Sequence, residues 1–597
     1  MAKKLQAINY TSRDFTSIRR DLETFAKRYY SNTYKDFNEA SFGSLMLDTV
    51  AYVGDILSFY LDYQANESFL DTAIEYNNVV RLARQFGFKL NTSPSSYGLL
   101  TFYISVPADG TGTAPNLDYT PVLEAGSEFS SLGGGLYTLL DDVDFKKESN
   151  QIVVGQVNNS TNLPTTFIIR SLGRAVSGRI GRDVISVGDF QRFRRVELSE
   201  PRINNIVSVV DSEGHEYFEV DHLSQNIVFK SLRNTSATRR TVPNILKAAP
   251  VARRFVTEYE GNKTYLQFGY GSDSELVTES INNPANIVLE LNGRNYITDT
   301  GFDPTKLISS DKFGIAPANT SLTISYRFNT VKDVNAAVNT ITKANSPRFK
   351  FDSQGQLNLG QRNTTMSSLE LTNEEPFVGD ISLPSSEEVK QRVFSYFSTQ
   401  HRAVTPEDYK AITYGMPVKF GAIKRAACVR DFDEFKRNLN LYIISENSSG
   451  KLTAANDTLK VNLKNWLAQY KMINDTIDLL DATIVNFKID YEILVDINAN
   501  RFTVINDANL ALRNFYSKGF DIGEALIITD IYKVLQKVDG VVDVIDVSVE
   551  EKTGPAYANS NYNFVGNLSA DGREILGQPS VIFELKFPNV DVRGSVK

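Results

Sequence analysis

Side chains that commonly carry out catalysis are scarce in this chain. Among 597 residues there are three histidines, one cysteine and one tryptophan. The single cysteine, Cys428, excludes a disulfide framework or a cysteine-based metal site within one chain. His215 and His222 are seven residues apart, not the four that place a zinc-binding pair on one helix face, and His401 precedes a predicted helix as a structural contact. We therefore expect no metal site and no catalytic centre built on these residues.

The common catalytic and phosphate-binding motifs are also missing. The nucleophile elbow of hydrolases, the P-loop and the dinucleotide-binding fingerprint do not occur. The glycine-rich segment Phe268–Asp273 follows a predicted strand with no helix after it, which does not suit a phosphate cradle. Asp141, Asp142 and Asp144 lack the spacing and the glycine of an EF-hand. We expect no cofactor, although the 71 acidic residues leave a carboxylate pair for glycoside hydrolysis open.

Long apolar runs and an excess of positive charge are absent as well. No stretch approaches 18 uninterrupted apolar residues, so we expect no membrane span. No apolar run follows the basic residues at the N-terminus, so we expect no signal peptide. The net charge of -8 and the pI near 5.3 argue against a general nucleic-acid binder. These features indicate a protein that is made in a reducing cytosol and stays there or in something assembled there.

Charge is nevertheless uneven along the chain. Residues 170–254 hold 15 lysine and arginine residues against 9 acidic ones, a local net of +6. An arginine-weighted patch is able to bind phosphates, but in an acidic protein it more often faces solvent or acidic partners. We expect Arg192, Arg194 and Arg195 to face an acidic protein neighbour or solvent, not nucleic acid.

The chain is too long for one hydrophobic core, and the spacing of its apolar residues changes along its length. Helical spacing dominates the start, short alternating runs separated by turn residues fill the middle, and strands and helices alternate at the end. The sequence predicts a multidomain α+β fold of four parts: a helical region at 1–90, a β-rich middle with two sub-domains at 91–345, a polar linker or arm at 346–384, and an α+β domain at 385–597.

One helix within residues 42–63 carries far more apolar surface than its neighbours in sequence are able to cover. It is free of proline and about six turns long. Its apolar residues recur at three- and four-residue spacing, and they are Phe42, Met46, Val50, Val53, Leu57, Tyr60 and Leu61. Two other lines run along the helix, and they are the acidic Asp48, Asp55 and Asp62 and the small Ser44, Ala51 and Ser58. A surface helix needs an apolar stripe only a little over 100° wide.

Two interpretations account for this surplus. The helix is either the central core helix of a large domain or a helix that packs against helices of another chain. In the second case the small-residue line permits close approach. The second is favoured because few segments nearby are able to surround the helix, and the middle of the chain is predicted to form strands.

Near the C-terminus the sequence predicts a helix at 529–538 and a strand at 541–549. The strand carries valine and isoleucine on both faces, so it is either central in a sheet or covered by another element. A self-contact in this region would involve Ile531, Val534, Leu535, Val538, Val541 and Val544.

Several blocks of the sequence resemble one family. The block NEASFGSLMLDTVAYVGDILSFYLDYQANESFL at 38–70 is similar to the N-terminal block of the baseplate wedge proteins of contractile-tailed phages, within the wider baseplate J-like family. Four further blocks resemble that family in the same order, and they lie at 266–276, 317–329, 401–429 and 520–549.

The resemblance implies a non-enzymatic structural subunit of the virion tail baseplate. In that family the N-terminal helices join those of neighbouring wedge proteins, the C-terminal domain contacts a second copy, and the wedges close into a ring that rearranges when the sheath contracts. The implied partners are other wedge proteins, a second copy, and the sheath-initiator and hub proteins of the tail, with no membrane and no nucleic acid. The alternative is a virion-associated polysaccharide-degrading enzyme.

Overall fold

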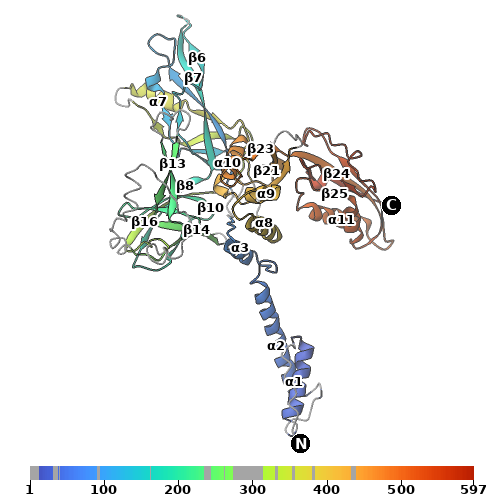
Figure 1. Cartoon of the computed structure of the whole chain (residues 1–597). Coiled ribbons are helices and arrows are strands. Elements are labelled where there is room, and N and C mark those ends of the chain that lie inside the picture. Colours follow the sequence, from blue (N-terminus) through green and yellow to red (C-terminus); the bar gives the residue numbers. More distant parts are fainter. Residues whose placement is uncertain are drawn as a thin grey trace. The chain divides into compact units, whose positions relative to one another are not determined.

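The structure is a computed structural model of the whole chain (Figure 1). It describes residues 13–30, 32, 38, 41–90, 95–159, 161, 163–233, 244–260, 263–272, 313–329, 334–352, 357–379, 384–431 and 438–597. The chain divides into two compact units, one formed by residues 1–90 with 384–397 and the other by residues 91–383 with 398–597. The predicted multidomain α+β class is confirmed, with helices first, a β-rich middle and a C-terminal α+β region.

The first unit is helical. Its elements are α1 (Phe15–Tyr29), α2 (Phe42–Asn66), α3 (Tyr76–Gln85) and α8 (Ser386–Thr399). The side chain of Asp14 caps α1 by accepting from the backbone N–H of Ser17, and Ser41 caps α2 in the same way. Gly87, just after the end of α3, has a φ of +82°, which favours glycine and is common where helices end.

Helix α3 begins later than residue type suggests. Aspartate is a common N-cap residue, and Asp71 would therefore be expected to start this helix, whereas α3 begins at Tyr76. The intervening residues form a turn because the Glu67 carboxylate accepts hydrogen bonds from the backbone N–H groups of Ile74 and Glu75. A side chain from the end of α2 therefore takes up backbone donors that a longer helix would have used.

The β-rich middle contains two seven-stranded sheets. The first has the order β17-β3-β4-β7-β1-β19 with β6 beside β7, and the second has the order β8-β16-β10-β11-β14-β15-β9. The strands of the first are β1 (Tyr97–Pro107), β3 (Glu128–Ser131), β4 (Leu136–Leu139), β6 (Gln151–Val157), β7 (Pro164–Ser177), β17 (Ile341–Ser346) and β19 (Glu370–Thr372). Those of the second are β8 (Arg179–Val187), β9 (Arg195–Glu197), β10 (Ile203–Val210), β11 (Glu216–Glu219), β14 (Arg254–Glu260), β15 (Lys263–Phe268) and β16 (Thr320–Phe328).

Smaller elements complete this region. They are η1 (Leu117–Tyr119), β2 (Val122–Leu123), β5 (Val143–Asp144), β12 (Ile227–Arg233), β13 (Asn244–Pro250), β18 (Phe349–Lys350) and α7 (Leu359–Ser367). The alternation predicted for residues 322–328 is confirmed, since Leu322, Ile324, Tyr326 and Phe328 are all buried in one core. The strand predicted at 287–291 lies outside the described residues.

Residues 346–384 are not a linker. The strand β19 pairs with β1, and Leu371 of β19 lies opposite Phe102. Leu371 and Phe377 are buried in the same core as Phe102. The polar composition of this segment misled the prediction because only its few inward-facing residues contribute to the core.

The C-terminal region begins with α9 (Pro406–Tyr414), whose N-terminus has proline at the first helical position, acidic residues in the first turn and a capping box between Thr405 and Asp408. Two small sheets follow, one with the order β20-β21-β22 and β23 beside β21, the other with the order β26-β24-β28 and β29 beside β24. Their strands are β20 (Arg425–Arg430), β21 (Asn438–Glu446), β22 (Leu452–Thr453), β23 (Thr476–Asp481), β24 (Thr483–Val495), β26 (Val541–Glu551), β28 (Val581–Glu584) and β29 (Val592–Val596). The remaining elements are η5 (Val418–Phe420), α10 (Asp457–Leu467), α11 (Arg501–Tyr516), β25 (Leu526–Ile527), α12 (Ile528–Gln536), β27 (Glu574–Ile575) and α13 (Pro588–Asp591).

Candidate helix-docking site

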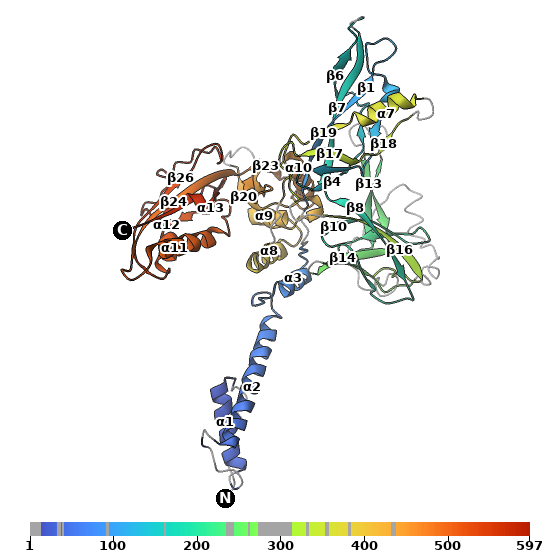
Figure 2. The same cartoon turned by 180° about the vertical axis from the view of Figure 1, so that it is seen from behind.

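Helices α1 and α2 form an antiparallel hairpin (Figures 1 and 2). Arg13, just before α1, pairs with Asp62 near the end of α2 at 2.7 Å, and Arg19 pairs with Asp48 near its beginning at 2.5 Å. Gly54 permits the close approach, because a Cβ there would lie 3.3 Å from the side chain of Ile18. The two ion pairs set the register of the hairpin.

The small-residue line of α2 faces its own chain. Ser44 and Ala51 are the buried residues of this helix, and Ser44 accepts a hydrogen bond from Arg19 at 3.2 Å. The sequence had suggested that this line admits a helix of another chain. Instead α1 occupies it, so the surface left for a partner lies on the opposite side of α2.

That opposite side is apolar and exposed. All seven residues predicted from helical spacing lie on it with 48–73 % of their surface exposed, and we call them the docking face: Phe42, Met46, Val50, Val53, Leu57, Tyr60 and Leu61. Since successive residues turn by about 100°, these seven span an arc of roughly 100°. The face is large enough to bury a further helix.

The exposed apolar surface extends beyond the docking face. Leu45, Tyr52 and Phe59 of α2 are also exposed, and they widen the arc to roughly 200° at the same angular step. On α1, Phe25 and Tyr29 are exposed and in ring contact with each other.

A membrane is a second environment that this surface would suit. By length and composition alone, α2 is the one helix in the described part of the chain able to cross a membrane, although the sequence contains no long uninterrupted apolar run. A spanning α2 would carry the ion pairs of Arg13 and Arg19 with Asp62 and Asp48 into the hydrocarbon, where charged groups are costly. The hairpin geometry therefore favours a protein surface over a lipid one.

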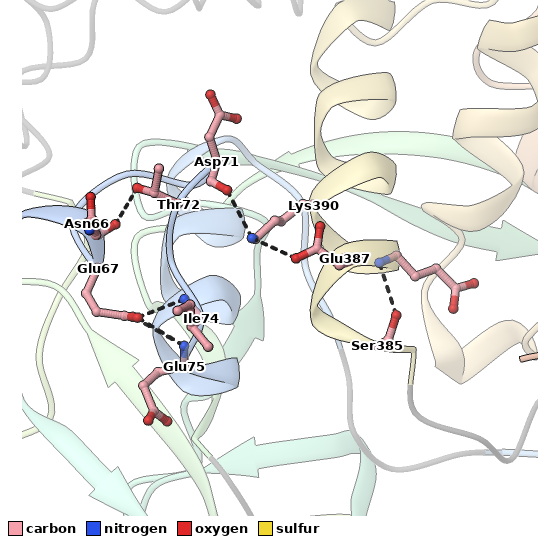
Figure 3. A network of polar contacts seen from close by, with 10 residues as sticks. Asn66, Glu67, Asp71, Thr72, Ile74, Glu75, Ser385, Glu387 and Lys390 are labelled. Carbon is pink, nitrogen blue, oxygen red and sulfur yellow. Dashed lines mark hydrogen bonds and ion pairs between the residues drawn. The ribbon is translucent and has the colours of Figure 1, made fainter. Parts of the chain in front are cut away.

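A polar network joins the end of α2 to α3 and α8 (Figure 3). The Glu67 carboxylate accepts from the backbone N–H of Ile74 at 2.8 Å and from the Asn78 side chain at 2.9 Å. From α8, Lys390 donates to the backbone carbonyl of Asp71 and to the Glu387 carboxylate, both at 3.0 Å. These hydrogen bonds thus link the turn after α2, at the base of the hairpin, to α8.

An apolar cluster supports the same junction. Val79 and Ala83 of α3 pack with Val389 and Val393 of α8, and all four are fully buried. Helix α8 is therefore an integral part of the first unit, although nearly 300 residues separate it from α3 in the sequence.

The hydrogen bonds to Glu67 predict a pH dependence for this junction. The bonds from Asn78, Ile74 and Glu75 lower the pKa of the Glu67 carboxyl from its ordinary value of 4.5. The pKa of the Glu67 carboxyl is therefore lower in the folded chain than in the unfolded chain. The ionised carboxylate stabilises the junction fully above about pH 4.5, and this stabilisation is lost as the pH falls through the pKa of the folded state. We expect amide protection of Ile74 and Glu75, measured by hydrogen exchange corrected for intrinsic rates, to decline over that range. Glu67→Gln should remove the decline, and an unchanged decline in that variant would contradict the assignment.

The C-terminal residues predicted for self-contact face their own domain. Ile531, Leu535 and Val544 are buried in the core around β24, so they form no surface. Val534, Val538 and Val541 are half-buried and pack against the same core. The side chains available instead are Val542 and Ile545, which the register shifts of β26 leave exposed.

Two further large apolar residues are exposed beside them. Ile497 is 96 % and Phe502 is 85 % exposed, in the turn after β24 and at the start of α11. That turn is joined to the start of β26, because the backbone N–H of Asp496 donates to the carbonyl of Gly540. Spacing analysis missed both residues, since neither lies in a periodic apolar run.

The arginine-rich stretch makes contacts within its own chain. Arg195 pairs with Glu258 and Glu260 at 3.1 and 2.9 Å, so its acidic partners are not those of a neighbour. Arg194 donates to a backbone carbonyl, and Arg192 is exposed. The expectation of an acidic neighbour stays a prediction only for Arg192.

The residues that the sequence analysis considered for a Ca²⁺ site, a thiol site or a phosphate cradle make contacts within the chain. Asp141 pairs with Arg174, and Asp142 accepts from a backbone N–H. Burial raises the pKa of the Cys428 thiol to about 12, which keeps it protonated. Gly269 is needed for packing, because a Cβ there would lie 2.1 Å from the carbonyl oxygen of Gly314. Across the described ranges, no group of three or more His, Cys, Asp or Glu residues is placed to hold a metal ion.

Comparison with known proteins gives a family match and similarities to solved structures, two of which are described below. Residues 14–85 match the family described as bacteriophage baseplate protein, N-terminal domain. No curated protein matches the chain. Among solved structures, the anti-feeding prophage baseplate aligns over 94 % of this chain and 89 % of that chain, at 10 % identity and a TM-score of 0.25. The TssK-TssF-TssG baseplate subcomplex of the type VI secretion system aligns over 74 % of this chain and 96 % of that chain, at 8 % identity and a TM-score of 0.23.

Proposed function

We propose that this chain is a structural subunit of a phage tail baseplate, acting as a wedge protein that joins its neighbours through α1 and α2. The observation that carries the proposal is a coincidence of two independent features. The segment that matches a baseplate N-terminal domain, residues 14–85, is also the segment that leaves the docking face exposed.

The docking face supplies the free energy for such a junction. Burying one exposed leucine, valine or phenylalanine side chain fully contributes roughly 1.5–3 kcal/mol. Five of the seven residues of the docking face are of these types, and an exposed apolar patch of this kind on a soluble protein commonly marks an interaction site. The partner we propose is one or more helices of a neighbouring baseplate protein, with apolar residues at three- and four-residue spacing, because the docking face itself carries no charge.

The proposed role is non-enzymatic and involves no cofactor. The alternative, a virion-associated polysaccharide-degrading enzyme, is supported by no motif in the sequence. Further parts of the proposal are contacts with sheath-initiator or hub proteins, closure of a ring of wedges that rearranges when the sheath contracts, and assembly in the host cytoplasm.

The proposal is tested by co-expressing the chain with its neighbouring tail genes. We expect a stable complex that negative-stain electron microscopy shows as part of a ring or wedge. Labelling of purified particles with an antibody to residues 398–597 should mark the baseplate end of the tail. A chain that stays monomeric in the co-expression and is absent from particles would contradict the proposal.

A self-contact of the C-terminal domain is also part of the proposal, now through Ile497, Phe502, Val542 and Ile545. Phe502→Asp should weaken concentration-dependent dimerisation by tenfold or more, because an exposed phenylalanine at a contact is a typical hot spot. Sedimentation equilibrium of the full chain measures this, with Leu57→Asp present throughout to silence the docking face. Leu510→Asp, on the same helix and 53 % exposed, is the control. Two results would contradict the contact. One is equal dimerisation of the Phe502→Asp and Leu510→Asp variants, and the other is no dimerisation at high micromolar concentration of the chain that carries Leu57→Asp alone.

A further inference from the structure

Strand β6 lies at the margin of the first sheet. It pairs with β7 on one side, and within the described residues no strand pairs with its other side. Both overall views show β6 beside β7 with no further strand beyond it (Figures 1 and 2). One edge of β6 therefore presents backbone N–H and C=O groups that are free to pair with another strand.

The side chains of β6 are apolar on both faces. Every residue of the strand is exposed, and its four aliphatic residues, Ile152, Val153, Val154 and Val157, are 47–61 % exposed. Val153 lies opposite Ile168, which is also exposed. On the other face, Ile152 and Val154 lie opposite the buried residues Ile169 and Phe167. Strand β6 thus presents apolar side chains on both faces of the sheet, next to its unpaired edge.

The edge of β6 also lacks the usual protection. Outer strands normally carry charged residues that prevent pairing with other chains. In the sheets that the structure describes, every other outer strand longer than two residues contains at least one charged residue, whereas β6, with the sequence QIVVGQV, contains none. An uncharged edge of this length is suited to receive a strand.

We propose that β6 pairs antiparallel with β6 of a second copy of this chain, about a two-fold axis at Val153. This arrangement places Val153 opposite its equivalent and Ile152 opposite Val154, with no charges opposed. Pairs of β-branched residues across antiparallel strands are favourable. A second copy is the occupant because the strand is self-complementary in both its side chains and its backbone. The contact involves neither α1 nor α2.

The expected contact is weak and depends on concentration. A register shift at Gly155 limits regular pairing to a few residues on each strand. Such a contact falls below the roughly 1,000 Å² that a stable interface buries. Chemical trapping is therefore a better test than the size of the protein in dilute solution.

The test is disulfide trapping of full-length Val153→Cys in a glutathione redox buffer. Directly opposite residues in an antiparallel pair have Cα atoms roughly 4.5–5.5 Å apart, within the range that a disulfide spans. Val184→Cys on the outer strand β8, where the valine is 65 % exposed, is the matched control. We expect the Val153→Cys dimer to form at least tenfold faster, and Ile152→Lys added to it to abolish that excess. The unsubstituted chain, whose Cys428 thiol is half-buried, is the blank.

Two results would overturn the proposal. One is equal dimerisation rates for Val153→Cys and Val184→Cys, which would indicate random collision. The other is a disulfide in assembled particles that joins the Val153→Cys side chain to a different protein, which would make the occupant a foreign strand. Circular dichroism of each variant verifies that the exposed substitutions leave the fold intact.

Discussion

Val53→Asp is expected to abolish assembly of the chain with its baseplate neighbours while leaving its own fold unchanged. Val53 lies in the middle of the docking face, and half of its surface is exposed in the isolated chain. In the proposed bundle this side chain becomes buried, and an unpaired carboxylate there costs several kcal/mol. An increase in Kd of at least a hundredfold follows, which co-purification and titration against the purified neighbour would measure. Leu57→Asp should act in the same way.

The matched control is Val461→Asp. Val461 is also a valine on a helix, α10, and its exposure is 51 % against 50 % for Val53. It lies outside the segment that matches the baseplate domain, so we expect no effect of this variant on assembly. If Val53→Asp assembled as well as Val461→Asp, the docking face would not be an interface between chains, and a membrane would become the better explanation of α2. Flotation of the unsubstituted chain with lipid vesicles would then test directly whether α2 binds a membrane.

Val393→Asp is expected to separate α3 from α8. Val393 is fully buried in the cluster that contains Val79 and Ala83 of α3. Placing an unpaired charge there costs about 3–5 kcal/mol, which is comparable to the whole stability of a small unit. We expect rapid hydrogen exchange in residues 76–88 and new protease cleavage near residue 90, with the β-rich middle unaffected.

The neighbouring substitution Phe394→Asp provides the comparison. Phe394 lies on the same helix, but nearly half of its surface is exposed and it is not part of the buried cluster. The change should leave exchange and proteolysis of residues 76–88 close to those of the unsubstituted chain. Equal effects of the two variants would mean that α8 is destabilised as a helix, not that its contact with α3 is specific.

Periodicity predicted well those features that depend on local spacing. The apolar face of α2 could be predicted because its seven residues repeat at helical spacing, and the start of α9 because proline and acidic residues mark its first turn. The alternation at Leu322 to Phe328 was equally clear. Spacing shows that a helix has an apolar face, but it does not show which segment or which other chain packs against that face.

The wrong predictions concern residues whose burial depends on contacts with segments far away in the sequence. Sequence alone did not show that α1 covers Ser44 and Ala51, because that depends on the register fixed by the Arg13 and Arg19 ion pairs. Val544 was read as available for a partner, but the sheet of β24 turns it into the core. Residues 346–384 looked like a linker because β19 has only three residues and its partner β1 lies more than 260 residues earlier.

The insertion of 293 residues, from 91 to 383, between the two segments of the first unit sets an order of events during synthesis. The ribosome completes α1, α2 and α3 long before it reaches α8. At 5–20 residues per second, the buried face of α3 waits roughly 15–60 s for Val389 and Val393. During that interval the base of the hairpin lacks its contacts with Val389 and Val393 of α8. In the proposed assembly, this discontinuity would delay the fixing of α3 beneath the docking face until most of the polypeptide exists.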